Sequence, residues 1–362
     1  MLRVLNVVGA RPNFMKIAPI IREMEKYPDA FEQFLVHTGQ HYDPDMSQVF
    51  FHELDIPSPD INLEVGSGSH TWQTAQVMMR FEPILQDFKP DWVNVVGDVN
   101  STLACSLVCA KLGIMVAHVE AGLRSFDNTM PEEINRKLTD QIADLLFTPS
   151  HDGDQNLLNE GIPAEKIRFV GNVMIDTLVR LLPKAQERWG ALRSKSGLED
   201  YLLVTLHRPS NVDQPETLRE IVSALVQVSK EIPVLFPVHP RTRQRFDDFG
   251  LTPASASVML LDPLGYLDFL ALQAHATLVL TDSGGIQEET TYLGVSCLTA
   301  RPNTERPVTI THGTNRLVES ECRSLVTAIR DALSSAHSDK LKPPLWDGKA
   351  AERIVNAYLE MA

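Results

Sequence analysis

The sequence predicts an α/β protein with two domains, each built on a parallel sheet that helices cover on both faces. Its 362 residues are enough for about two domains of ordinary size. Short and almost wholly apolar runs alternate with amphipathic stretches, and this alternation starts again near Tyr201. Because apolar strands between helices are typical of sheets buried on both faces, the pattern indicates two parallel sheets in succession.

Each predicted strand is an apolar run, and helix-like segments separate the runs. In the first half we expect strands at residues 2–8, 34–38, 92–96 and 115–119, and helices around residues 15–26, 71–87 and 101–112. In the second half the strand pattern returns at residues 202–206, 234–238, 258–262 and 277–281. Ligands of such sheets bind outside the carboxyl ends of the strands. We therefore expect the functional site at the strand ends, in a cleft between the two halves.

The domain boundaries follow from the same pattern. We expect a first domain at residues 1–170 and a second at residues 171–346, joined by a helix-like stretch that leads into Ser194-Lys195-Ser196-Gly197. Residues 347–362 form an amphipathic tail. We expect this tail to form a helix that packs back on the first domain.

The composition is that of an ordinary folded protein, with 43% hydrophobic and 22% charged residues. A formal net charge of −14 argues against nonspecific binding to nucleic acid or anionic membranes. The sequence has no signal-peptide pattern and no apolar run long enough to span a bilayer. Cys105 and Cys109 share a helical face without metal-knuckle spacing, which favours packing in a reduced interior. These features predict a cytoplasmic protein that holds any anionic ligand through a local basic cluster.

The segment 278–294, LVLTDSGGIQEETTYLG, has the pattern of a phosphate-binding turn. An apolar strand leads through Ser283, Gly284 and Gly285 into a helix-compatible segment. Glycines let the backbone approach an anion, and the free N–H groups of the helix start point at it. The helix end contributes only roughly 0.3–1 kcal/mol, so positive side chains such as Arg301 and Arg306 are needed as well. We expect a nucleoside diphosphate, and the alternative is an ordinary turn with a Ser or Asp cap.

Polar residues also follow the strands of the first half. Arg11 and Lys16 flank a predicted helix start and could face a phosphate, or they could be a solvated pair. Asp98, Glu120 and Glu132 follow the third strand, the fourth strand and the next predicted helix start. Converging acids with positive neighbours are suited to general acid–base catalysis, whereas the alternative for each is a helix cap or a surface charge. These acids, even together with His118, lack metal-site spacing.

Two strand ends of the second half carry histidines. His207 and Arg208 follow its first strand, and His239 follows its second. His207 could enter the cleft from the wall opposite the acids, or it could be a structural residue whose hydrogen bonds are satisfied. His239 could reach a phosphate or a sugar hydroxyl.

Taken in order, these motifs resemble the non-hydrolysing UDP-N-acetylglucosamine 2-epimerase family over nearly the full chain. Each motif alone is weak, but the ordered set is specific. The matching elements are GARPNFMKIAP (9–19), TGQH (38–41), VVGDVNST (95–102), HVEAGLRS (118–125), PEEINR (131–136), TLHR (205–208), PVHP (237–240), DPLGY (262–266), TDSGGIQEE (281–289), TERP (304–307) and GTN (313–315).

The resemblance implies two Rossmann-like domains as in GT-B glycosyltransferases, with UDP held mainly by the second domain. It also implies a cytoplasmic homodimer that converts UDP-N-acetylglucosamine to UDP-N-acetylmannosamine for surface polysaccharides, with no metal and no other cofactor. In the family's chemistry, UDP leaves C1 as the C2 proton is removed, which gives a 2-acetamidoglucal. Readdition of UDP and protonation of the other face give the epimer.

The resemblance also implies roles for individual residues. Asp98, Glu120 and Glu132 match the family's catalytic carboxylates, and His207 matches its essential histidine. The match leaves open which acid removes the C2 proton. The residues that match UDP-binding positions are Arg11, Lys16, His239, Phe269 near the uracil, Ser283, Gly284, Gly285, Glu289 at the ribose hydroxyls, and Arg306.

Several positions depart from the family's usual pattern. Residues 12–16 are Pro-Asn-Phe-Met-Lys in place of Pro-Glu-Ala-Ile-Lys, and Pro209-Ser210 follows Arg208 in place of Arg-Glu. Gln40, His41 and Arg208 match positions at which a second substrate molecule activates many bacterial members. The departures leave that activation open. They also leave a related UDP-sugar, such as a diacetamido uronic acid, as an alternative substrate.

Three further alternatives stay open at this point. One is a GT-B UDP-sugar glycosyltransferase, since fold does not determine function. Another is a UDP-sugar-binding regulator without activity, and the third is a variant that releases the free sugar by hydrolysis.

Overall fold

The structure is a computed structural model that describes residues 1–39, 57–197, 199–335 and 342–361. The chain divides into two compact units. The first contains Met1–Arg180 together with Pro344–Ala362, and the second is Leu181–Pro343. The division lies inside helix α7 (Val173–Ser196), ten residues later than the boundary at residue 171 that we expected from the sequence.

The first unit is built on a seven-stranded parallel sheet with the order β3-β2-β1-β4-β5-β6-β7. Its strands are β1 (Leu2–Val8), β2 (Phe31–His37), β3 (Ile61–Asn62), β4 (Trp92–Val96), β5 (Met115–Val119), β6 (Leu145–Thr148) and β7 (Ile167–Phe169). Its other helices are α1 (Arg11–Met24), α3 (His70–Phe88), α4 (Asn100–Leu112), α5 (Pro131–Ile142), α6 (His151–Asn159), the 3-10 turn η1 (Ala164–Lys166) and α15 (Ala350–Leu359).

The strand residues of the first sheet alternate between two cores, as expected for a sheet covered on both faces. On one face, Leu5 and Val7 pack with Val77 and Phe81 of α3 and with Cys105 of α4. On this face the interior is apolar and both thiols are free, and burial raises the pKa of the Cys109 thiol to about 12. The predicted packing of the two cysteines is confirmed.

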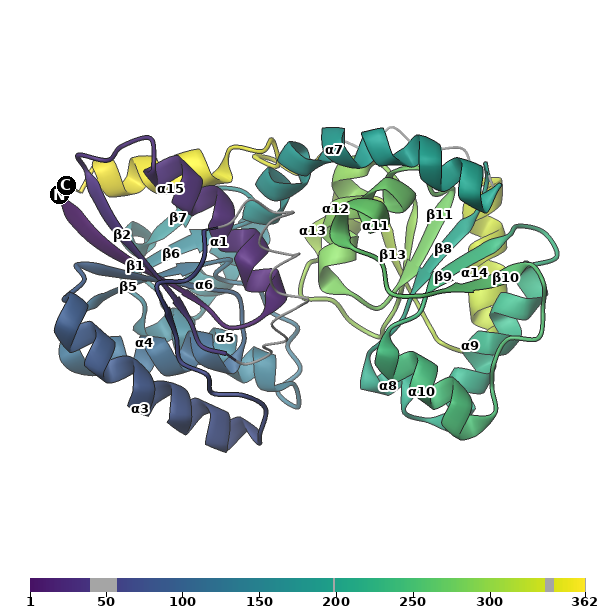
Figure 1. Ribbon diagram of the computed structural model, residues 1–362, viewed down its shortest axis with the longest axis horizontal. Coiled ribbons are helices and arrows are strands. Elements are labelled where there is room, and N and C mark those ends of the chain that lie inside the picture. The colour runs from purple at the N-terminus through teal and green to yellow at the C-terminus, as the bar shows by residue number, and fades with distance from the viewer. Residues whose placement is uncertain (40–56, 198, 336–341, 362) are drawn as a thin grey trace. The chain divides into compact units, whose positions relative to one another are not determined.

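Helices α1 and α15 pack together on the other face of the first sheet (Figure 1). The ring of Tyr358 in α15 lies within 6.4 Å, centroid to centroid, of the rings of Phe31, Trp92 and Phe147. Two backbone N–H groups at the start of α15 also donate to the carboxylate of Asp176 in α7. The predicted return of the C-terminal helix to the first domain is confirmed.

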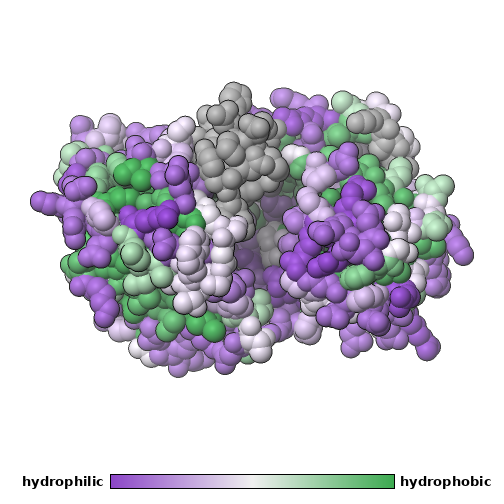
Figure 2. All heavy atoms as spheres, turned by 60° about the horizontal axis from the view of Figure 1, so that its bottom comes forward, coloured by the Kyte–Doolittle hydropathy of each residue, from purple (hydrophilic) through white to green (hydrophobic). Residues whose placement is uncertain are grey.

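Part of the helical surface of the first unit is hydrophobic. Figure 2 shows hydrophobic residues at the surface of the unit on the left. Trp72 and Met79 on α3 are 43% and 69% exposed, and Ile134 and Leu138 on α5 are 46% and 47% exposed. Both helices pack against α4, so the exposed hydrophobic side chains lie on either side of α4.

The second unit repeats the same design with a six-stranded parallel sheet in the order β10-β9-β8-β11-β12-β13. Its strands are β8 (Leu202–Thr205), β9 (Val234–Pro237), β10 (Val258–Leu261), β11 (Leu278–Thr281), β12 (Cys297–Ala300) and β13 (Asn315–Val318). Its helices, besides part of α7, are α8 (Pro209–Val212), α9 (Pro215–Val228), α10 (Pro240–Phe249), α11 (Tyr266–Ala274), α12 (Gly284–Leu293), α13 (Val308–Thr311) and α14 (Cys322–Ser334).

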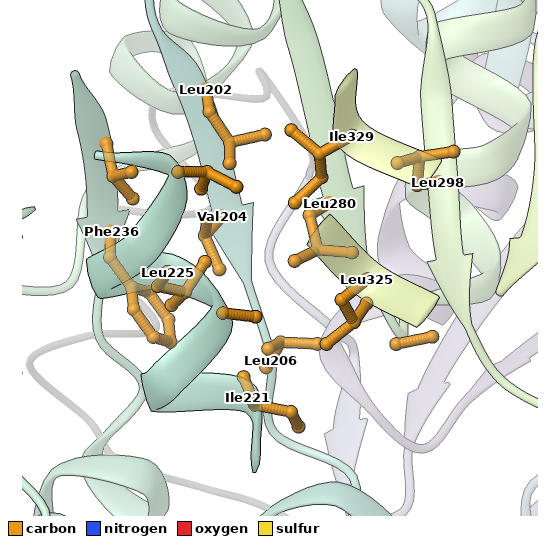
Figure 3. Close-up of a cluster of buried hydrophobic side chains, with 14 of the residues drawn as sticks. Leu202, Val204, Leu206, Ile221, Leu225, Phe236, Leu280, Leu298, Leu325 and Ile329 are labelled. Carbon is orange, nitrogen blue, oxygen red and sulfur yellow. The ribbon is translucent and has the colours of Figure 1, made fainter. Parts of the chain in front are cut away.

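The core of the second unit follows the alternation of its strands. Leu202 and Val204 point to the face that α9 and α14 cover, where Leu225 and Ile329 pack against them (Figure 3). The residue between them, Leu203, packs in the cluster on the opposite face. Burial on both faces explains why the strands of this unit are so nearly free of polar residues.

Among the described residues, every helix is too short or too polar to cross a bilayer.

Candidate active site

The polar residues identified from the sequence lie at the carboxyl edges of the two sheets. In both sheets the strand order reverses at one point, between β1 and β4 in the first unit and between β8 and β11 in the second. This reversal makes the crevice outside those strand ends the usual ligand position in a doubly wound sheet. The segments that follow these strands carry most of the candidate residues in each unit.

The turn from β1 to α1 is held by Asn13, one of the positions that depart from the family's usual residues. Its side-chain oxygen accepts hydrogen bonds from the N–H groups of Gly9 and Ala10 at 3.2 and 2.9 Å. Its amide donates to the carbonyl of Val96 at the end of β4, at 3.0 Å. Asn13 therefore ties the two strand ends at the reversal point together. Nothing is described for the side chain of Arg11, at the start of α1.

Lys16, on α1, forms a buried ion pair with Glu120, which follows β5. The two residues are 7% and 6% exposed. Glu120 has a φ of 72°, in the left-handed region that few residues other than glycine adopt. A Cβ atom placed on Gly97 would lie 3.4 Å from Oε2 of Glu120, so this carboxylate lies beside the residue that precedes Asp98.

Asp98 belongs to a second charged cluster at the same edge. Its carboxylate pairs with Arg136 of α5, and its carbonyl accepts a hydrogen bond from Asn135 at 2.9 Å. Arg136 also donates to Glu133 at 2.7 Å, and Glu133 is 0% exposed. Burial alone would raise the pKa of Glu133, but hydrogen bonds from Ser125 and the charge of Arg136 lower it below its ordinary value. The positive neighbours that the acids require are therefore Lys16 and Arg136.

Glu132, the third acid predicted, lies in the first turn of α5 and is half-buried. Its neighbour Glu133 is the acid that joins the Asp98 cluster, and the sequence did not single it out. The missed signal was the spacing of Glu133 and Arg136, three positions apart on one helix, which places their side chains on the same face.

In the second unit, the carboxylate of Asp282 joins the two strand ends at the reversal point. It accepts backbone N–H groups of His207 and Arg208, at 3.0 and 2.9 Å, and the side-chain amide of Asn211 at 3.0 Å. Nδ1 of His207 lies 3.2 Å from Asp282. Burial would raise the pKa of Asp282, but His207 and Asn211 lower it. An ionised Asp282 orients the imidazole of His207 and leaves its Nε2 available to a substrate.

His239 lies next to His207, with ring centroids 5.5 Å apart. It caps α10, and its Nδ1 accepts the N–H of Arg241 at 3.2 Å. Burial, with smaller effects of His207 and Arg241, lowers the pKa of His239. A neutral ring whose Nδ1 accepts a hydrogen bond carries its proton on Nε2, which suits a donor to phosphate or sugar oxygen.

The turn Ser283-Gly284-Gly285 begins helix α12, as the sequence predicts. A Cβ atom on Gly284 would lie 2.5 Å from Nη1 of Arg306 and 2.8 Å from Oε1 of Glu305. A Cβ atom on Gly285 would have no heavy atom within 4 Å. Gly284 is therefore required by packing, whereas Gly285 leaves open space at the helix start.

Arg306 lies behind this turn and is 7% exposed. It donates to Glu288 at 2.7 Å and pairs with Glu305, which Arg301 also contacts at 2.8 Å. Burial alone would raise the pKa of Glu305, but Arg306 and Arg301 bring it far below its ordinary value. Arg208 approaches the same carboxylate only to 4.0 Å. Three guanidinium groups therefore gather near the start of α12, and Arg208 is the one least bound to protein carboxylates.

Glu289, on α12, is 2% exposed and accepts a hydrogen bond from the hydroxyl of Tyr266 at 2.9 Å. Burial raises the pKa of Glu289 to about 7, although the Tyr266 hydroxyl favours the charged form. Phe269 lies one helical turn from Tyr266 and packs at the edge of the apolar cluster around Leu203.

The predicted pair Gln40 and His41 lies outside the described residues. Among the residues that are described, His, Cys, Asp and Glu side chains form no group of three that could hold a metal ion.

Comparisons with known proteins agree with the motifs. A family model described as UDP-N-acetylglucosamine 2-epimerase matches residues 22–359. The UDP-N-acetylglucosamine 2-epimerase of Methanocaldococcus jannaschii is 43% identical over 357 residues, with 96% of each chain covered. The UDP-2,3-diacetamido-2,3-dideoxy-D-glucuronate 2-epimerase of Pseudomonas aeruginosa is 40% identical, with 99% of each chain covered.

Solved structures give the same result for the fold. The crystal structure of the Methanocaldococcus jannaschii enzyme in complex with UDP-GlcNAc and UDP matches with a TM-score of 0.91 at 43% identity, covering 100% of both chains. The predicted fold class, two Rossmann-like units of the GT-B type, is confirmed. The chain belongs to the UDP-N-acetylglucosamine 2-epimerase family.

Proposed function

We propose that this protein interconverts UDP-N-acetylglucosamine and UDP-N-acetylmannosamine by inverting C2. The observation that carries this proposal is the pair of carboxylates Glu120 and Asp98, each beside a cation, at the carboxyl edge of the first sheet. Membership of the epimerase family and the ligands named for the Methanocaldococcus jannaschii structure support the choice of substrate.

The C2 hydrogen is not made acidic by an adjacent carbonyl, so direct deprotonation is difficult. In the proposed reaction a carboxylate takes the C2 proton while the C1–O bond to UDP breaks. The electron pair of the C2–H bond forms the C1–C2 double bond of a 2-acetamidoglucal, and the C1–O pair leaves with UDP. In the second half, UDP adds back to C1 and a protonated acid delivers a proton to the opposite face of C2. The atoms balance with no other reactant.

The proposal assigns proton transfer to Asp98, Glu120 and Glu132 in the first unit and to His207 in the second. General acid–base catalysis typically accelerates a reaction about 10²–10⁴-fold. Electrostatic stabilisation of the leaving diphosphate must supply much of the remaining rate enhancement. We assign this task to residues around the starts of α12 and α10 in the second unit and to two residues of α1 in the first. They are Arg11, Lys16, His239, Ser283, Gly284, Gly285 and Arg306. Glu289 is assigned to the ribose hydroxyls and Phe269 to the uracil.

A related substrate is the second candidate. The diacetamido glucuronate epimerase of Pseudomonas aeruginosa is nearly as similar to this chain as the first relative. The same elimination and readdition would serve this sugar, since its C2 also carries an acetamido group. A glycosyltransferase of the same fold differs in one testable respect, because it needs an acceptor and leaves UDP-sugar alone unchanged.

We also propose that the protein acts in the cytoplasm as a homodimer. The described cysteines are all free, as expected in a reducing compartment. The exposed apolar residues of α3 and α5 give the first unit a surface suited to a second copy of the chain. Light scattering of the wild type and of an Ile134→Asp, Leu138→Asp double variant tests this, and a monomeric wild type would contradict it.

The decisive experiment is incubation with UDP-N-acetylglucosamine in D₂O, followed by NMR. We expect deuterium at C2 of both epimers, little free sugar and no need for added metal. A parallel incubation with the diacetamido uronate substrate distinguishes the two candidates. A UDP-binding preparation that exchanges no C2 hydrogen in either substrate would contradict the proposed function, and abundant free sugar would indicate hydrolysis instead.

A further inference from the structure

A buried chain of ionisable side chains lies behind the strand ends of the first sheet. His118, in β5, and Asp140, in α5, are both 0% exposed. Nδ1 of His118 lies 2.6 Å from Oδ1 of Asp140, and its Nε2 lies 2.8 Å from the carbonyl oxygen of Gly97. Arg124, which is 1% exposed, pairs with Oδ2 of Asp140 at 2.7 Å. The two ring nitrogens of His118 are therefore both occupied by protein groups.

This pair contacts the backbone of both loops that carry the proposed acids. The carbonyl that His118 binds belongs to the residue directly before Asp98. The N–H of Gly122, two residues after Glu120, donates to Oδ2 of Asp140 at 3.1 Å. One histidine–aspartate pair thus links the loop after β4 to the loop after β5. Loss of His118 would free the carbonyl of Gly97, and loss of Asp140 would free the N–H of Gly122 together with Nδ1 of His118.

The loop after β5 needs such support because its backbone is strained. Glu120 has a φ of 72°, and Gly122 has a φ of 80°. A Cβ atom on Gly122 would lie 2.5 Å from the carbonyl oxygen of Gly153, so the loop is also tightly packed. Left-handed backbone at a residue other than glycine persists only where the surroundings impose it, and it is concentrated at functional sites. The N–H groups of Glu120 and Ala121 both donate to the carbonyl oxygen of Phe147. The N–H of the following residue, Gly122, is the one that Asp140 accepts.

The hydrogen-bond partners also determine where the protons are. A carbonyl oxygen and a carboxylate both accept hydrogen bonds, so each nitrogen of His118 must donate one. Burial alone would raise the pKa of Asp140, but His118 and Arg124 lower it below its ordinary value. Asp140 is therefore held as a carboxylate, and each ring nitrogen of His118 faces an acceptor oxygen.

We propose that His118 and Asp140 are positioning residues of the epimerisation reaction, which hold Asp98 and Glu120 in register with each other. The inference rests on the proposed function of those two acids. The pair does not touch the substrate. Its effect on the reaction comes through the two loops, and a misplacement of about 1 Å at a reacting group can lower a rate about 10²-fold.

The variant Asp140→Asn tests this role with little change of shape. The amide can still bond to the ring, but it removes the negative charge that faces Nδ1 of His118 and Arg124. We expect kcat to fall about 10- to 100-fold, with the Kd of UDP changed by less than about 2-fold, because UDP is assigned mainly to the second unit. His118→Ala should lose at least as much, and His118→Gln should recover part of the loss by donating to Gly97.

Asp144→Asn is the matched control. Its carboxylate also binds the backbone of β5, through the N–H of Val116 at 2.9 Å, but at the opposite end of that strand. We expect its kcat to stay within about 2-fold of the wild type, because no proposed acid depends on it. A loss of stability appears in the unfolding curve of either variant, whereas a positioning role lowers the kcat of the folded protein and does so only in Asp140→Asn.

NMR of protein labelled with ¹⁵N-histidine gives a readout independent of turnover. We expect two ring N–H signals for His118, assigned by their loss in His118→Gln, and only one in Asp140→Asn. A single N–H in the wild type would contradict the arrangement in which both ring nitrogens of His118 donate hydrogen bonds. Folded Asp140→Asn and His118→Ala proteins with wild-type kcat would overturn the positioning role. A wild type that exchanges no C2 hydrogen would instead overturn the proposed function, so the two failures are distinguishable.

Discussion

Lys16 and Glu120 form an ion pair that is almost completely removed from solvent, although 104 residues separate them in the chain. The pair joins the first helix of the sheet to the strained loop after β5. Glu120 is thereby kept beside a cation that is itself a candidate ligand of the diphosphate. A phosphate that approached Lys16 would compete with Glu120 for the ammonium group, which couples the position of the leaving group to the basicity of the acid.

Replacement of one partner of this pair should therefore affect both stability and turnover. We expect Lys16→Met to lower the free energy of unfolding by about 3–5 kcal/mol, because it leaves a buried carboxylate unpaired. Glu120→Gln should abolish C2 exchange while UDP binding stays measurable. The measurements are urea unfolding, calorimetry with UDP and exchange in D₂O.

The surface pair Lys26–Glu23 at the end of the same helix serves as the control. Lys26→Met should change the free energy of unfolding by less than about 1 kcal/mol. If Lys16→Met proved equally harmless, the buried pair would not have the structural importance assigned to it.

The two glycines of the phosphate turn should respond differently to substitution by alanine. Gly284→Ala places a methyl group against Arg306 and Glu305, so we expect it to lower the free energy of unfolding by about 1–3 kcal/mol. Gly285→Ala meets open space and should leave stability unchanged or slightly higher. If the diphosphate occupies that space, Gly285→Ala should still weaken UDP binding, by about 10-fold or more. Thermal unfolding and UDP titration of both variants separate the effects, and normal UDP affinity of Gly285→Ala would place the ligand elsewhere.

Asp282 should stabilise the second unit in a pH-dependent manner. Its pKa is lowered in the folded protein, so its contribution is fully present above the ordinary carboxyl pKa of about 4 and is lost as the pH falls through the lower folded value. We expect Asp282→Asn to lower the free energy of unfolding by about 1.5–3 kcal/mol at pH 7, and the difference to narrow below about pH 4. Urea unfolding at several pH values measures this difference.

Asp213 provides the comparison for this variant, because its pKa is also lowered, mainly by a hydrogen bond from Arg241 near the surface. Asp213→Asn should change the free energy of unfolding by less than about 1 kcal/mol. A pH-independent effect of Asp282→Asn would show that Asp282 acts through packing and not through its charge.

UDP affinity should rise with pH through about 7. Burial raises the pKa of Glu289 to about 7 in the free protein, and ribose hydroxyls donate to its ionised form. The raised pKa of Glu289 also stabilises the folded protein at low pH, and this contribution is complete below the ordinary carboxyl pKa of about 4.3. It is lost as the pH rises through about 7, so the free energy of unfolding of the free protein falls between these two values. Calorimetric titration with UDP should show this pH dependence in the wild type and a flatter one in Glu289→Gln. The difference between the two proteins cancels the titration of UDP itself, and parallel curves would remove Glu289 from the ribose site.

The sheets could be predicted from the sequence largely because their strands are buried on both faces. β1, β4 and β5 begin and end at the expected residues, and β8, β9, β10 and β11 lie within the expected ranges. The omitted strands are shorter or lie toward the sheet edges. β3 has two residues and β7 has three, too few for any periodicity to be visible.

The candidate site could be predicted only in part. Asp98, Glu120 and His207 each follow closely after an apolar strand, so their position in the sequence was enough to identify them. Their partners could not be identified in this way, because Arg136 and Asp282 reach them from segments distant in sequence. Lys16 was expected to face a phosphate, whereas the structure gives it a carboxylate partner within the first unit. The roles of these residues in turnover stay predictions.

Tyr358 packs on Phe31, Trp92 and Phe147, so the apolar face of the first sheet is completed by one of the last helices of the chain. During synthesis the ribosome adds α15 only after every residue of the second unit. At about 5–20 residues per second, the nascent first unit waits roughly 10–40 s with that aromatic surface uncovered. The second unit, which is continuous in the chain, can fold in the meantime, and the first becomes complete only once translation has reached α15.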